Sequence, residues 1–183
     1  VGMGLPITAS YVIVLLFGVL PLSNLGVPTL TAHLICYWVA VVSAVTPPVA
    51  LAAYAASAIA QSDPVRTGFQ ALRLSSWIFL MPFLFAYTPI LLDGARVDIF
   101  LTVVACLLGI VAWGGVLERY LAKKTTNIEW LLMCAASLAL LFPVDHLMVF
   151  LTPLSGDFHY VAYLLGALFL GLVFYMQRTR QTA

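Results

Sequence analysis

The sequence predicts an all-α integral membrane protein, a polytopic helical bundle with a re-entrant hairpin end and a discontinuous helix. Of its 183 residues, 63% are hydrophobic and only 8% are charged, whereas a soluble domain carries roughly 25% charged residues. The apolar residues occur in blocks close to the ~20 residues that cross a ~30 Å hydrocarbon layer as a helix. Two of these blocks also contain residues that break helices.

The first apolar block runs from Ala9 to Leu20 and is followed by Pro21. About twelve helical residues rise only ~18 Å, so we expect half a membrane span. The segment Gly2 to Ser10, at the start of this block, has glycines that permit close approach, a proline suited to the first turn of a helix, and the hydroxyls of Thr8 and Ser10. This chemistry fits the tip of a re-entrant hairpin, and a tight turn without a ligand is the alternative.

The second apolar block, Thr31 to Ala60, is too long for one straight crossing and contains adjacent prolines near its middle. Because proline lacks an amide donor and its ring clashes with the preceding turn, we expect two half-helices that meet at Thr46 to Pro48. The carbonyls of about Val42 to Val45 would then lack helical partners, beside the hydroxyls of Ser43 and Thr46. Neutral oxygens of this kind could bind a hard cation; a proline kink capped by neighbouring side chains is the alternative.

The other predicted spans have no such break, apart from a kink in the first. They are Leu74 to Leu92, kinked near Pro82, Val97 to Leu117, Ile128 to Pro143, and His159 to Met176. Between the last two, Asp145 to Asp157 could lie at the membrane interface.

The distribution of basic residues predicts the orientation of the chain. The connections Gln61–Arg73 and Glu118–Glu129, together with the end after Gln177, carry 7 of the 8 Lys and Arg residues. The positive-inside rule therefore predicts a cytoplasmic C-terminus.

The charge pattern also limits the possible chemistry. No Asp, Glu, Lys or Arg precedes Asp63, so neither break has a local carboxylate that could relay protons. If these breaks bind an ion, Na⁺ held by neutral oxygens is favoured over a proton carried by a local carboxylate. His33 could be an interfacial residue or a proton carrier. The pairs Asp145–His146 and Asp157–His159 have no further ligand nearby, which argues against a metal site.

Several function classes are not expected. No enzyme signature is recognisable and no cofactor motif is present. No basic run interleaved with aromatics suggests nucleic-acid binding.

Three segments of the sequence resemble one family of membrane transporters. These are Val1-Gly-Met-Gly-Leu-Pro-Ile-Thr-Ala-Ser-Tyr11, His33 to Tyr54 with its Ser43-Ala-Val-Thr-Pro-Pro48, and Asp63-Pro-Val-Arg-Thr-Gly68. They are similar to the C-terminal part of the large permease of tripartite ATP-independent periplasmic (TRAP) transporters, especially members with fused small and large subunits. Such a chain would begin within a longer permease.

The resemblance implies an elevator-type secondary transporter of the bacterial inner membrane that takes up organic acid anions. It implies a periplasmic substrate-binding protein and a small membrane subunit, or its fused equivalent, as partners. The ion and substrate site would use residues of both breaks: Gly2, Gly4, Pro6, Thr8, Ser43, Thr46, Pro47 and Pro48. The candidate Na⁺ ligands are the hydroxyls of Thr8, Ser43 and Thr46.

We therefore expect residues 1–93 to be the C-terminal part of a transport domain and residues 94–183 to be a membrane extension of about three helices. The leading hypothesis is a Na⁺-coupled permease segment without enzymatic activity. The alternative is a membrane scaffold or assembly subunit that does not itself transport.

Overall fold

The computed structural model describes residues 5–142 and 158–180. These residues form helices and connecting turns, and no β-strand is present among them. The chain divides into two compact units, Val1–Ala86 and Tyr87–Ala183. Within the described residues, three helices are long and apolar enough to cross a membrane, and a bent helix pair could form a fourth span. The predicted all-α, polytopic membrane fold is confirmed.

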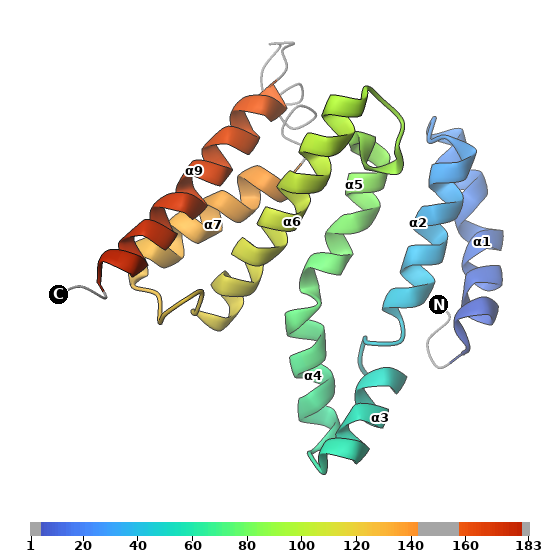
Figure 1. Ribbon diagram of the computed structural model, residues 1–183. Coiled ribbons are helices and arrows are strands. Elements are labelled where there is room, and N and C mark those ends of the chain that lie inside the picture. Colours follow the sequence, from blue (N-terminus) through green and yellow to red (C-terminus); the bar gives the residue numbers. More distant parts are fainter. Residues whose placement is uncertain (1–4, 143–157, 181–183) are drawn as a thin grey trace. The chain divides into compact units, whose positions relative to one another are not determined.

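Helix α1, Ile7–Asn24, opens the first unit (Figure 1). Pro6 is its N-cap residue, which agrees with the prediction that Pro6 begins a new helix. The predicted stop at Pro21 is wrong, because the helix continues through this proline to Asn24. Its 18 residues rise ~27 Å, so α1 nearly spans the hydrocarbon layer instead of half of it.

Helix α1 ends at Asn24 because the chain turns at Gly26, two residues later. The Gly26 amide donates to the Ser23 carbonyl at 3.0 Å, and the Val27 amide donates to the Leu22 carbonyl at 3.1 Å. This pair of bonds is a Schellman motif, which requires a left-handed residue, and Gly26 has φ +86°. Pro28 then caps the next helix.

Helix α2, Thr29–Val42, packs antiparallel to α1, and helix α3, Leu51–Ala60, follows after an irregular segment, 43–50. The predicted division of this block into two half-helices is confirmed. The break is wider than the predicted Thr46 to Pro48, because the helical ladder ends before Ser43 and resumes only after Ala50.

The next segment contains α4, Pro64–Leu74, the 3₁₀ helix η1, Ser76–Leu80, and α5, Met81–Tyr87. The prediction of one span from Leu74 to Leu92 with a kink near Pro82 is therefore wrong. The chain bends by 50° between α4 and the segment Ser76–Tyr87. A second 3₁₀ helix, η2, Pro89–Leu91, begins the second unit.

A serine hydroxyl lies at the bend of this segment, and a proline interrupts the helix further along. The Ser75 hydroxyl donates to the Ala71 carbonyl at 2.6 Å, and bonds of this kind bend helices. Pro82 lacks the amide that would bind the Ile78 carbonyl, and the Trp38 indole donates to that carbonyl at 3.0 Å. The Ile78 carbonyl thus accepts bonds from α2 and from the Met81 amide.

The second unit contains α6, Arg96–Glu118, α7, Asn127–Leu141, and α9, Phe158–Thr179. These bounds agree with the last three predicted spans to within about three residues. Helix α7 packs closely against both α6 and α9. The predicted interfacial segment Asp145 to Asp157 lies outside the described residues.

Candidate functional site

The candidate site is the break between α2 and α3, where two hydroxyls bind the last carbonyls of α2. The Ser43 Oγ donates to the Ala40 carbonyl at 2.6 Å, and the Thr46 Oγ1 donates to the Val42 carbonyl at 2.8 Å. Both side chains are half-buried. Because each hydroxyl proton is used in a bond to the backbone, the oxygen lone pairs remain as possible ligands for a cation.

The carbonyls of the break lack ordinary helical partners, as predicted, but most of them accept other hydrogen bonds. The Val42 carbonyl accepts from the Val45 amide at 3.2 Å, and the Ser43 carbonyl accepts from the Thr46 amide at 3.4 Å. The Ala44 carbonyl accepts from the Ala52 amide at 3.1 Å, across the break. Turn-like bonds therefore stabilise this irregular backbone, which would otherwise be costly in a membrane.

Pro47 and Pro48, in the second half of the break, contact residues of α3 and α4. The Tyr54 hydroxyl donates to the Pro48 carbonyl at 2.5 Å. On α4, Gly68 is so close that a Cβ there would lie 3.2 Å from Tyr54 Cε1 and 3.6 Å from Pro47 Cγ. The last residue of the Asp63-to-Gly68 motif thus packs against the break, a role that the sequence pattern did not assign to it.

The first described motif residues lie at the N-terminus of α1. Pro6 and Thr8 are exposed, and Ser10 is fully buried. Gly2 and Gly4, which were predicted to form the hairpin tip, lie outside the described residues. Within the described chain no hydrogen bond joins Thr8 to Ser43 or Thr46.

A polar contact that the sequence did not predict joins α1 to α2. The Tyr11 hydroxyl and His33 Nδ1 are 2.8 Å apart. The Tyr11 ring also packs edge-on against Tyr37, with 5.8 Å between ring centroids. His33 therefore has a partner inside the helix pair. The 22 residues that separate Tyr11 from His33 explain why no local pattern revealed the contact.

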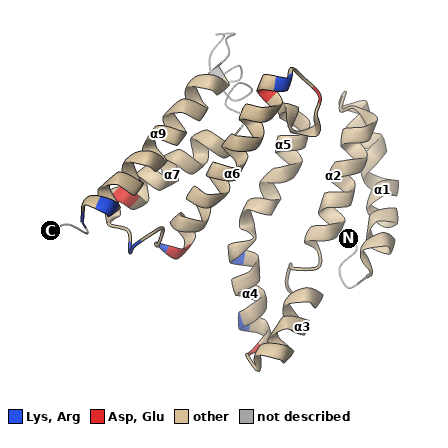
Figure 2. Cartoon of the chain, in the orientation of Figure 1, with Lys and Arg blue, Asp and Glu red and all other residues tan. Residues whose placement is uncertain are grey.

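The helices of the candidate site carry no formal charge. Figure 2 shows no Lys, Arg, Asp or Glu residue along α1, α2 and α3, and the first charged residue of the sequence is Asp63. No group of three or more His, Cys, Asp or Glu residues that could hold a metal ion exists among residues 5–142 and 158–180. Of the two pairs that the sequence argued against as metal sites, Asp145, His146 and Asp157 lie outside these ranges.

Comparison with known families identifies the break-containing part of the chain. Residues 1–97 match the family model described as "Tripartite ATP-independent periplasmic transporter, DctM component". The searches of curated proteins and of solved structures gave no match. The matched segment covers more than half of the 183 residues and includes α1, the break and α4. The chain therefore belongs to the DctM component family, the large permease family of the TRAP transporters, whose members are membrane transporters and not enzymes.

Proposed function

We propose that this chain is the permease segment of a Na⁺-coupled secondary transporter that imports organic acid anions. A periplasmic binding protein delivers the substrate, and a small membrane subunit or its fused equivalent completes the permease. The protein lies in the bacterial inner membrane with its C-terminus in the cytoplasm. Transport requires no cofactor, and Na⁺ is the coupling ion.

The observation that carries this proposal is the uncharged break between α2 and α3. Its hydroxyl oxygens lie on one turn, because Ser43 and Thr46 each bind a carbonyl of α2. Transporters commonly coordinate Na⁺ with the unwound backbone and half-helix ends of discontinuous helices. Hydroxyl and carbonyl oxygens suit a hard monovalent cation, and Thr8 at the start of α1 is the third candidate ligand.

The same break also supports a second function. Its Val42, Ser43 and Ala44 carbonyls already accept hydrogen bonds from the protein, so the break could be a packing device in a membrane scaffold or assembly subunit. In that case the two hydroxyls would stabilise the backbone and would bind no ion.

Uptake into proteoliposomes distinguishes these functions. The complete permease is reconstituted with its binding protein, and uptake is measured as a function of the Na⁺ concentration. For Ser43→Ala and Thr46→Val we expect the Na⁺ concentration for half-maximal uptake to rise about tenfold, because one ligand worth ~1.4 kcal/mol is lost. Thr46→Ser keeps the hydroxyl and should retain Na⁺ dependence.

Ser57→Ala is the matched control. The buried Ser57 hydroxyl donates to the Tyr54 carbonyl at 2.7 Å, the same kind of bond that Ser43 makes, but on α3 away from the break. Its removal should leave the Na⁺ dependence unchanged. Uptake that ignores both the Na⁺ gradient and the removal of the binding protein would refute the proposed function, and unchanged uptake by Ser43→Ala and Thr46→Val would favour the scaffold.

A further inference from the structure

The second unit has an apolar groove between α6 and α9. Helix α7 packs against both of these helices, which contact each other much less, so a groove remains along their seam. One part of it has a volume of about 470 Å³ and is lined by Leu108, Val111, Ala167, Leu170, Gly171 and Phe174. Gly171 is exposed, and a Cβ there would meet no atom within 4 Å. The groove is therefore open at this point.

The groove continues into a smaller pocket that is lined by two cationic side chains. This pocket has a volume of about 180 Å³, shares Ala122 and Phe174 with the groove, and is also lined by Lys123, Gln177 and Arg178. Gln177, which is 1% exposed, links the two sides of this pocket, the loop after α6 and the end of α9. Its Oε1 accepts from the Ala122 and Lys123 amides, each at 3.1 Å. The loop after α6 is thus fixed beside the last turn of α9.

The side chains of Lys123 and Arg178 have no carboxylate partner within the described residues. The buried carboxylate of the neighbouring Glu129 binds Arg180, the Thr126 amide and the Gln177 amide group. Lys123 and Arg178 consequently present unneutralised positive charge to whatever occupies the pocket. Basic pockets between helices at a membrane surface favour anionic lipid headgroups.

Trp130 indicates that this end of the second unit lies at the membrane surface. The Trp130 indole donates to the Val116 carbonyl at 3.1 Å, and the Arg119 guanidinium lies 5.3 Å from the centroid of the Trp130 ring. Tryptophan beside a cation is typical of the headgroup level. The charged part of a ligand at Lys123 would therefore lie at the headgroup level, and its apolar part in the groove would lie in the hydrocarbon layer.

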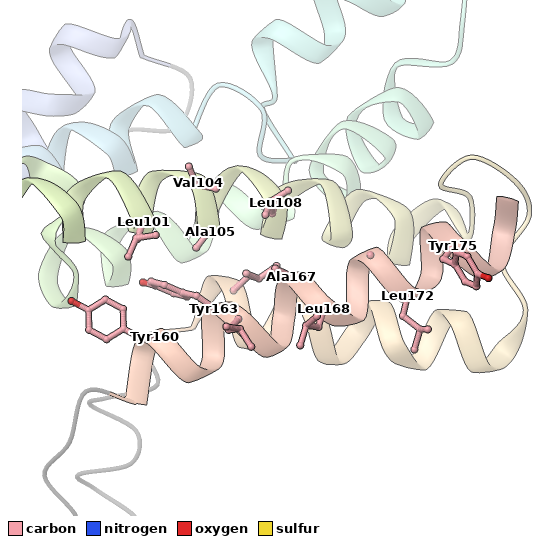
Figure 3. Close-up of a pocket in the computed structure, with 13 residues that line it drawn as sticks. Leu101, Val104, Ala105, Leu108, Tyr160, Tyr163, Ala167, Leu168, Leu172 and Tyr175 are labelled. Carbon is pink, nitrogen blue, oxygen red and sulfur yellow. The ribbon is translucent and has the colours of Figure 1, made fainter.

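We propose that this surface binds one anionic phospholipid, with its phosphate at Lys123 and Arg178 and an acyl chain along the α6–α9 groove. From Phe174 to Leu164 the helix rises ~15 Å, half the hydrocarbon thickness. Leu164 lines an adjoining apolar pocket of about 800 Å³ between α6 and α9, which Figure 3 shows with Leu108 and Ala167 between the two helices. The apolar surface is thus long enough for an acyl chain of one leaflet.

Native mass spectrometry of the intact permease tests this site. The delipidated protein is exposed to phosphatidylglycerol or phosphatidylcholine with identical acyl chains, and bound lipid is counted after detergent release. We expect one retained phosphatidylglycerol, with about tenfold preference over phosphatidylcholine. The variant K123Q/R178Q should lose this preference, whereas K124Q/R66Q, which removes the same charge outside the pocket, should keep it.

A second pair of variants tests the groove. Gly171→Leu places a side chain in open space and should abolish retention of the lipid without lowering the thermal midpoint. Gly114→Leu is its control, because a Cβ at Gly114 also meets no atom within 4 Å and Gly114 does not line the groove. Equal retention of both lipids, a preference that survives K123Q/R178Q, lipid retained by Gly171→Leu, or displacement by inorganic phosphate alone would each overturn the proposal.

Discussion

At the scale of single residues, the two units differ in the charge of their polar groups inside the helix packing. The break near Thr46 contains only neutral oxygens, and their positions could be predicted because prolines act locally. Glu129 in the second unit is a fully buried carboxylate whose role could not be predicted. Its capping box with Thr126 is local, but its partners Gln177 and Arg180 come from α9 and the residue just after it, and no local pattern links positions 48 and 51 residues apart.

The Glu129–Arg180 pair should show an asymmetric mutational cost. Arg180 has a 42% exposed side chain, whereas that of Glu129 is 0% exposed. Arg180→Gln leaves a buried carboxylate without its cation, whereas Glu129→Gln leaves an exposed cation and can still accept a hydrogen bond from the Thr126 amide. Thermal unfolding of the intact protein in detergent should therefore give a larger loss of midpoint for Arg180→Gln.

The double variant E129Q/R180Q is the control for this pair. It should be more stable than Arg180→Gln alone, with a coupling free energy of about 1–3 kcal/mol. Additive losses from the two changes would contradict the assignment of a stabilising pair.

At the scale of elements, the sequence predicted the break at two adjacent prolines but misplaced the helix end at a single proline and the bend at a serine. Adjacent prolines correctly predicted a break between α2 and α3, although α2 already ends at Val42, before the predicted Thr46 to Pro48. Pro21 removes only one donor, and membrane helices tolerate this, so the actual end of α1 depends on Gly26. The bend at Ser75 depends on a hydroxyl–carbonyl bond, which the sequence does not distinguish from an exposed serine.

Two glycines of α9 should respond oppositely to substitution. A Cβ at Gly166 would lie 2.5 Å from Leu140 Cγ and 3.2 Å from the Ala136 carbonyl oxygen. Gly166→Ala should therefore separate α9 from α7, since small residues permit close helix packing in membranes. We expect a lower thermal midpoint for Gly166→Ala. Gly171→Ala should leave it unchanged or raise it, because alanine favours helix; equal losses would contradict this packing.

At the scale of the whole molecule, composition was enough to predict the membrane fold, and the family was predictable from motifs in residues 1–68. The candidate site was predictable only in part. The sequence indicated which oxygens lie at the break, but their bonds to α2 and the packing of Gly68 depend on contacts between elements. The break could therefore be located from the sequence, but its supporting contacts could not.

The predicted orientation can be tested by labelling single cysteines in intact cells. The native Cys36, Cys106 and Cys134 are first replaced by alanine, and Asp93→Cys or Lys124→Cys is introduced at an exposed position. A membrane-impermeant maleimide should label the Asp93→Cys variant but label Lys124→Cys only after permeabilisation. The reverse pattern would show that the positive-inside prediction is wrong.

The absence of formal charge from α1, α2 and α3 has an electrical consequence. A membrane potential does ~2.3 kcal/mol of work per elementary charge for each 100 mV crossed. Displacement of these three helices along the membrane normal moves no Asp, Glu, Lys or Arg charge through that field. Any current linked to their movement would therefore measure the charge of bound ions and substrate, without a gating contribution from the helices themselves.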